Sequence, residues 1–182
     1  MSLRTSIEEM IIRYTINPSL RAQQSDFTRE FNKVKKILIA LSPGFASNIN
    51  TMICNQISTL FPGRILFLLT PSSTTGISNS FSNNWITVDP GIETPTLFNV
   101  SKAEKLKELN QKGINLFIDL EEKFSIRNIY ICRAFDPSIR ISFPKKHSDR
   151  YYNIVYSGYK GKDYVKKVSG LITFLKSFLN NP

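Results

Sequence analysis

The stretch from Lys36 to Leu60 reads KILIALSPGFASNINTMICNQISTL, and it decides the fold class of this chain. Its first part, Ile37–Leu41, is a short apolar run bounded by polar residues, which is typical of a buried strand. From Asn48 to Leu60 the apolar residues recur at helical spacing, as on a helix that packs one face against a sheet. The stretch therefore predicts a strand, a tight turn and a helix, which together open an α/β fold.

The same alternation of strand and helix patterns continues along the chain. We expect strands at 65–69, 85–88, 114–120, 139–143 and 151–156, and helices at 6–14, 101–112, 124–135 and 163–179. Strands that alternate with helices imply crossover connections and a parallel sheet covered on both faces. The sequence therefore predicts an α/β fold with a single Rossmann-like, doubly wound, mostly parallel sheet.

The chain is expected to consist of two segments. Residues 1–34 are expected to form an N-terminal helix and a connector, and residues 35–182 the Rossmann-like domain. Within that domain Pro71–Asn84 consists mostly of Ser, Thr, Asn and Gly, which bury little surface, so a long loop is expected there.

The composition sets the class of protein. With 182 residues and 41% hydrophobic content, the chain is long enough for one well-buried domain. Its apolar runs are too short to span a bilayer, and its N-terminus lacks the layout of a secretion signal. Cys54 and Cys132 lie in apolar helical patterns without a CxxC motif, which is typical of buried, reduced thiols. We therefore expect a cytoplasmic protein without a transmembrane segment.

The net charge of +10 is concentrated toward the C-terminus, where Lys145–Pro182 holds eight basic and two acidic residues. Such a region can meet nucleic acid, an anionic lipid surface or a phosphorylated sugar. Its tyrosines are interleaved with the lysines, but no known nucleic-acid-binding motif is present, so nucleic acid is the disfavoured partner. A solvated helix face is the favoured interpretation, and peripheral contact with a membrane stays open.

A ligand of such a fold is expected at the carboxyl ends of the strands. No dinucleotide or phosphate loop motif stands there, because Gly44 is alone and Pro43 lacks an amide proton. The single histidine, His147, lies among lysines and is interpreted as a surface residue. We expect no metal site and no cofactor. The predicted ligand-binding residues are Ser42, Gly44, Ser47, Asn48, Asp119 and Glu121.

Three carboxylates, Asp119, Glu121 and Glu122, follow a predicted buried strand. In α/β proteins this position holds Mg²⁺ or accepts a phosphoryl group. The favoured alternative is structural, since Glu121 and Glu122 would also stabilise the N-terminus of the next helix through its dipole. Asp119 ends the strand itself and is therefore the stronger catalytic candidate, together with Ser47.

These motifs resemble the N-terminal half of the ADP-heptose:lipopolysaccharide heptosyltransferase family. In that family a lysine and an apolar strand lead through a short turn to a helix that ends in an aromatic-Pro pair. Later it has a strand ending in Asp-Leu, a Ser-Leu-Arg-like helix and an Arg-Ile-Gly-Phe strand. The corresponding residues here are Lys36–Leu41, Phe61-Pro62, Ile118-Asp119-Leu120, Ser125-Ile126-Arg127, Arg140-Ile141-Ser142-Phe143 and Tyr152-Asn153-Ile154-Val155.

The resemblance implies a bacterial protein related to lipopolysaccharide biosynthesis, with two departures from the family. The family's first turn carries a Gly-Asp pair whose aspartate is implicated as the catalytic base, and Ala46 and Ser47 stand at about the matching positions. A serine hydroxyl does not accept a proton at pH 7. The family also binds its donor with a second Rossmann-like domain, whereas the resemblance covers only Lys36–Tyr156.

The leading hypothesis is therefore a heptosyltransferase-like domain that is non-catalytic alone and binds a sugar, an anionic envelope precursor or a partner protein. One alternative is a small enzyme that uses Asp119, with or without Mg²⁺, on a phosphorylated substrate. The other is a binder of nucleic acid or an anionic surface through the basic C-terminal region.

Overall fold

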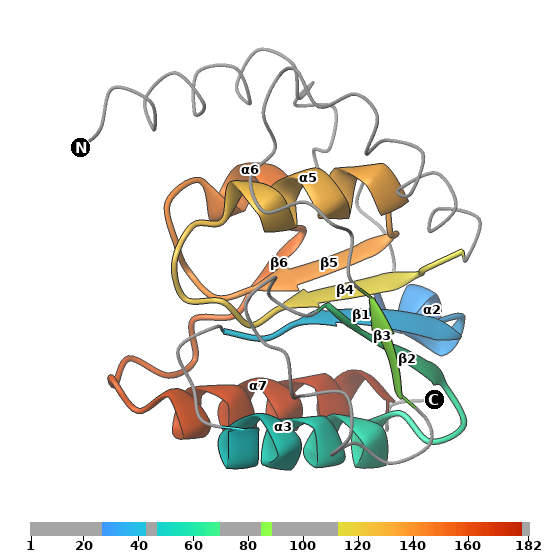
Figure 1. The fold of residues 1–182 in the computed structure, drawn as a ribbon, viewed down its shortest axis with the longest axis horizontal. Coiled ribbons are helices and arrows are strands. Elements are labelled where there is room, and N and C mark those ends of the chain that lie inside the picture. Colours follow the sequence, from blue (N-terminus) through green and yellow to red (C-terminus); the bar gives the residue numbers. More distant parts are fainter. Residues whose placement is uncertain (1–26, 43–46, 70–84, 89–112, 180–182) are drawn as a thin grey trace.

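A computed structural model describes residues 27–42, 47–69, 85–88 and 113–179 of the chain. At its centre lies a six-stranded sheet with the strand order β3-β2-β1-β4-β5-β6, and every neighbouring pair of strands is parallel (Figure 1). The strands are β1 (Lys36–Ala40), β2 (Ile65–Leu69), β3 (Trp85–Val88), β4 (Leu116–Asp119), β5 (Ile139–Ser142) and β6 (Ile154–Val155).

Helices cover both faces of this sheet (Figure 1). On one face lie α3 (Ser47–Leu60) and α7 (Tyr164–Leu179), and on the other lie α5 (Ile126–Phe135) and α6 (Ser148–Tyr151). The short α2 (Phe27–Asn32) packs against α7. The predicted Rossmann-like, doubly wound α/β sheet is confirmed.

Alternation of side chains along the strands divides the core into two clusters. On β1, Ile37 and Ile39 pack toward α3 and α7, whereas Leu38 and Ala40 belong to the cluster beside α5 and α6. Both faces are buried, which explains why the strands are continuous apolar runs. The face toward α5 departs from this rule, because the buried polar residues Asp119, Arg140 and Ser142 occupy its strand positions.

The helix α2 was not predicted, and it belongs to the core of the sheet. Phe31 and Val34 are fully buried in the cluster beside α3 and α7. The ring of Phe31 stacks on that of Phe178 from α7, with 5.2 Å between centroids. Residues on both sides of position 35 therefore share one core, and the division into residues 1–34 and 35–182 stays a prediction.

The predicted strand at 151–156 is wrong in its first half. Tyr151 ends α6, and strand pairing is limited to Ile154–Val155. The physical reason is that Tyr151 and Tyr152 are both buried in the cluster beside α5, which a strand with alternating side chains would not allow. The predicted helices at 6–14 and 101–112 and the predicted loop at 71–84 lie outside the described residues.

Two other expectations concern the described residues. Cys54 and Cys132 are free and buried, as predicted. Burial raises the pKa of Cys54 to about 12 and also raises the pKa of Cys132, so both thiols stay protonated at neutral pH. No described helix combines the length and the apolar character needed to cross a bilayer.

Candidate functional site

The strand order creates a topological switch point between β1 and β4. From β1 the chain continues to β2 on one side, and from β4 it continues to β5 on the other. Ala40 of β1 is in register with Asp119 of β4, and the Leu120 amide donates to the Ala40 carbonyl at 2.9 Å. Ligands of open α/β sheets bind outside the carboxyl ends of the strands at such a point. The ends of β1 and β4 are therefore the candidate site.

Asp119 lies at this point, and all of its acceptor positions are occupied. Its Oδ1 accepts from the Glu121 amide and from Asn128 Nδ2, both at 3.0 Å. Its Oδ2 accepts from Lys145 Nζ at 2.7 Å and from the Tyr152 hydroxyl. A carboxylate has about four lone-pair sites, and its side chain is only 1% exposed. Asp119 thus has no position left for a metal ion or for a substrate proton.

The side-chain partners of Asp119 come from three different segments, and their hydrogen bonds join these segments to the end of β4. Asn128 belongs to α5, Lys145 follows β5, and Tyr152 follows α6. The Lys145 side chain is 2% exposed, and its Nζ also donates to the Glu121 carbonyl at 2.8 Å and lies 5.2 Å from the centre of the Tyr152 ring. Burial, and then the charge of Asp119, raises the pKa of Tyr152, so its hydroxyl remains a donor. We call Asp119, Asn128, Lys145 and Tyr152 the Asp119 network.

Glu121 lies at the outer side of the Asp119 network and is only partly buried. Its Oε2 accepts from Asn128 Nδ2 at 3.0 Å, the same nitrogen that donates to Asp119. Burial and then the charge of Asp119 raise the pKa of Glu121, while Lys145, Ser125 and Arg127 act in the opposite direction. Unlike Asp119, Glu121 is accessible to a molecule in solution.

A second set of contacts joins the start of α7 to the same edge of the sheet. Lys167 Nζ pairs with Glu122 Oε1 at 2.7 Å and lies 5.0 Å from the centre of the Phe143 ring. Burial raises the pKa of Tyr164, and the backbone of Ser42 acts against that rise. The segments after β1, β4 and β5 are therefore all held in place at the candidate site.

The predicted site residues are placed as follows. Ser42 is buried just after β1, Ser47 is the first residue of α3, and the exposed Asn48 accepts the Ile49 amide on its own Oδ1 at 2.8 Å. Asp119 and Glu121 lie at the neighbouring end of β4, whereas Gly44 lies outside the described residues. Whether these residues bind a ligand stays a prediction.

The two glutamates precede α5, whose first turn contains no acidic residue, and the Ser125 hydroxyl accepts the Asn128 amide there at 3.3 Å. Glu121 is bound to the Asn128 side chain in the first turn of α5, and Glu122 pairs with Lys167 of α7. A stabilising effect of either glutamate on the helix dipole stays a prediction. Their structural role is to join separate elements at the carboxyl edge.

The sequence did not reveal Asn128, Lys145 or Tyr152 as members of the network. The signal that could have found them is Asp119 itself, because a buried carboxylate requires partners. Lys145 stands only three residues beyond β5, the neighbour of β4 in the sheet. Its local sequence, with another lysine next to it, is that of a basic surface residue.

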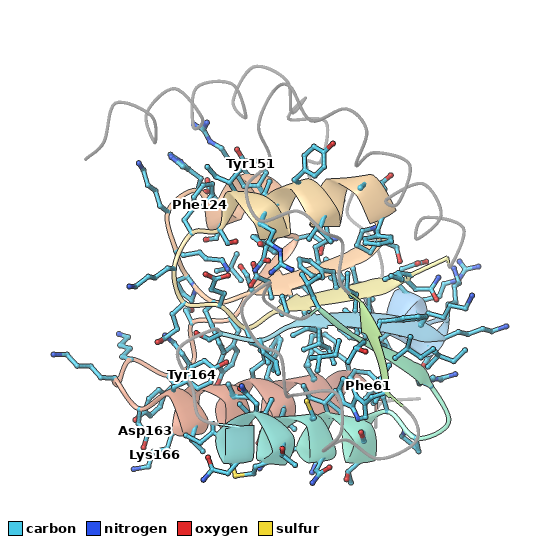
Figure 2. All side chains as sticks on the ribbon, viewed as in Figure 1. Phe61, Phe124, Tyr151, Asp163, Tyr164 and Lys166 are labelled. Atoms are coloured by element: carbon cyan, nitrogen blue, oxygen red, sulfur yellow. The ribbon has the colours of Figure 1, made fainter. Side chains whose placement is uncertain are left out.

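The basic C-terminal region does not form one face of the molecule. Lys146 and Arg150 lie beside or within α6 on one side of the sheet, whereas Lys166 and Lys176 belong to α7 on the other side. Figure 2 shows Phe124 and Tyr151 on the α6 side and Asp163, Tyr164 and Lys166 at the start of α7. Because Tyr151, Tyr152 and Tyr164 are buried, they are not placed to stack on bases.

Metal-ligating residues are not gathered at the candidate site. Within the described ranges, no three His, Cys, Asp or Glu side chains are grouped so that they could hold a metal ion. His147 is the residue before α6 and has a left-handed backbone, and its ring meets Phe124 edge-on with 6.0 Å between centroids.

Comparisons with known proteins show which structure this fold resembles. No protein-family model and no curated protein matches the sequence. The structure is similar to that of the E. coli heptosyltransferase WaaC with ADP-2-deoxy-2-fluoro heptose, with a TM-score of 0.54. The chain has a glycosyltransferase-like fold. The match covers 76% of this chain and 47% of WaaC at 12% sequence identity, so the chain spans about half the length of WaaC and the likeness concerns the fold alone.

Proposed function

We propose that this glycosyltransferase-like domain binds a sugar or an anionic envelope precursor at the carboxyl ends of β1 and β4, and that it does not transfer a sugar by itself. The observation that carries the proposal is the likeness of the fold to a heptosyltransferase whose structure contains a nucleotide-sugar analogue. The switch point between β1 and β4 supports the same location, since open α/β sheets bind ligands there.

Two features support a binding role rather than catalysis by this chain alone. Asp119 is the buried carboxylate of the edge, and its four acceptor positions are filled by the chain's own donors. Ser47, at the start of α3, is neutral and cannot act as a base near pH 7. Transfer would therefore require groups that another chain or segment supplies, and a partner protein is part of this proposal.

The test is a titration of the ¹⁵N-labelled protein with a phosphorylated lipopolysaccharide-core sugar, monitored through its amide spectrum. We expect shift changes at Ser42, Asn48 and Glu121, which lie at the proposed edge. Replacement of the exposed Asn48 by Ala should weaken binding, whereas Asn55→Ala should leave it unchanged, because Asn55 is also exposed but lies two turns further along α3. Changes spread over α7 and α6 without the strand ends would overturn the proposed site.

A transfer assay with a lipopolysaccharide-core acceptor completes this test. The isolated chain should release no ADP and modify no acceptor. Any turnover by the wild type would refute the non-catalytic role. Turnover that is lost in Asp119→Asn while this variant keeps the circular dichroism spectrum of the wild type would favour the Asp119-dependent enzyme. Binding that depends steeply on salt and requires Lys160 and Lys162 would favour the anionic-surface alternative.

A further inference from the structure

We propose that the ion pair of Glu122 and Lys167 binds two adjacent hydroxyl groups of a sugar. The Lys167 ammonium group donates to the oxygen of one hydroxyl group, and the Glu122 carboxylate accepts a hydrogen bond from the other. This role rests on the proposed function and makes it more specific, because it assigns the hydroxyl groups of the ligand, rather than a phosphate group, to this part of the carboxyl edge.

The pair lies on the side of the sheet that α3 and α7 cover. Glu122 is the third residue after β4, and Lys167 lies in the first turn of α7. Figure 1 shows α3 and α7 side by side, and both helices begin at the carboxyl edge. Tyr164, which opens α7, lies beside the backbone of Ser42 just after β1. The pair therefore lies near the ends of both β1 and β4, where the ligand is proposed to bind.

Lys167 is held in place but keeps donors for a ligand. Its Nζ atom lies 2.7 Å from Glu122 Oε1 and 5.0 Å from the centre of the Phe143 ring. The side chain is 16% exposed, so it is largely enclosed yet still reached by solvent. An ammonium group has three donors. Glu122 is the only acceptor bonded to Nζ among the described residues, which leaves two of these donors for hydroxyl oxygens.

Glu122 supplies acceptors beside these donors. Its side chain is 37% exposed, and its carboxylate offers about four lone-pair sites, of which the bond to Lys167 uses one. A hydroxyl group both donates and accepts hydrogen bonds, so adjacent hydroxyl groups match a surface that does the same. The pair carries no net charge and therefore attracts a phosphate group less strongly than an unpaired lysine does. Its chemistry thus fits the hydroxyl groups of a sugar.

Packing distinguishes this pair from a neighbouring one. Phe143 is fully buried, and its ring meets that of Tyr164 edge-on with 6.4 Å between centroids, so the surface against which Lys167 packs is fixed. Lys166, the adjacent residue, is 70% exposed and lies 3.8 Å from Asp163. A lysine that is already ordered loses less side-chain freedom on binding. Lys167 is therefore the better contact for a ligand, and Lys166 is its matched control.

The test uses the whole chain and methyl α-D-mannopyranoside, an uncharged sugar with adjacent ring hydroxyl groups. The affinities of this sugar and of its monodeoxy analogues are measured from amide shifts of the ¹⁵N-labelled protein. In the wild type, loss of either recognised hydroxyl group should weaken binding about tenfold, because a hydrogen bond to a charged group is lost. Lys167→Met and Glu122→Ala should each weaken binding of the parent sugar about tenfold, and each should abolish the effect of removing one of the two hydroxyl groups. Lys166→Met should behave as the wild type.

Three results would overturn the role of the pair. The monodeoxy analogues test the wild type without any substitution, so equal affinity for all of them would refute the contact with hydroxyl groups. A variant that weakens the parent sugar and every analogue equally would reveal a structural effect in place of a direct contact. Inorganic phosphate that binds more tightly to Glu122→Ala than to the wild type, and not to Lys167→Met, would show an anion site instead.

Failure of this role and failure of the proposed function give different spectra. If the phosphorylated core sugar shifts Ser42 and Asn48 while neither variant of the pair alters binding of the mannoside, the proposed function stands and the role of the pair is refuted. If neither sugar changes the amide spectrum at the carboxyl edge, both are refuted.

Discussion

Removal of one partner of the buried Asp119–Lys145 pair should strongly destabilise the fold. The two side chains are 1% and 2% exposed, and their Oδ2 and Nζ atoms lie 2.7 Å apart. Breaking a buried pair from one side leaves an uncompensated charge, which typically costs about 3–5 kcal/mol. In Lys145→Met the Asp119 carboxylate keeps its bonds to Glu121, Asn128 and Tyr152, so we expect a loss of about 3 kcal/mol, at the lower end of that range.

The reverse change, Asp119→Asn, should cost at least as much, about 3–5 kcal/mol. It leaves the Lys145 ammonium with the Glu121 carbonyl and the Tyr152 ring as its remaining contacts. The double variant removes both charges together. Its loss should be smaller than the sum of the single losses by about 2 kcal/mol or more, since residues of one network are not additive.

Urea unfolding at pH 7, followed by circular dichroism, measures these losses when the slope with denaturant is unchanged. Lys166→Met serves as the matched control, because Lys166 pairs with Asp163 at 3.8 Å and is 70% exposed. That change should cost less than about 1 kcal/mol, as is usual for surface pairs. If the variants at Asp119 and Lys145 lose as little stability as this control, or if their losses are strictly additive, the buried ion pair does not stabilise the fold as we infer.

Three further predictions concern single positions. Glu121→Gln should be more stable than the wild type at pH 7 but not below pH 4.5, the ordinary pKa of glutamate. Because the pKa of Glu121 is raised in the folded protein, the unfolded chain releases this proton first, and the stability of the wild type falls as the pH rises. Urea midpoints across pH measure this, and a difference between the two proteins that stays constant with pH would contradict it. In Gly170→Ala a Cβ atom would lie 2.5 Å from the Tyr156 hydroxyl, which offsets the gain of about 1 kcal/mol that Ala brings to a helix interior, so little net change is expected. In a Tyr156→Phe background the same change should stabilise the protein by about 1 kcal/mol, as measured by thermal unfolding, and the same small effect in both backgrounds would show that the hydroxyl is not the obstacle. Phe31→Ala should cost about 3–5 kcal/mol in the same assay because Phe31 is fully buried, whereas a loss below about 1 kcal/mol would separate α2 from the core of the sheet.

Local patterns in the sequence were sufficient for most of the fold. Apolar runs such as Ile65–Leu69 are strands because both sheet faces are covered, and the periodic stripe of residues 48–60 is the helix α3. Short elements escaped this reasoning. The helices α2 and α6 have six and four residues, too few for a periodic pattern to be distinguished from a polar segment.

The candidate site was predicted only in position. The ends of β1 and β4 were expected to meet because parallel strands end at one edge, and Ser42, Asp119 and Glu121 lie there. The roles of these residues could not be read from their neighbours in the chain. Lys145 has the local sequence of a surface residue, yet it is buried because β5 places it beside the Asp119 carboxylate.

The sequence by itself determined the α/β class, the parallel sheet and the edge at which a ligand is expected, because these depend on local periodicity and on strand direction. Only the tertiary structure decided which carboxyl group is available at that edge. Asn128, Lys145 and Tyr152 lie 9, 26 and 33 residues beyond Asp119 in the chain, and packing brings their donors onto its two oxygens. Hydrogen-bond saturation of the buried Asp119 leaves Glu121 and Glu122 as the carboxyl groups of this edge that solvent reaches.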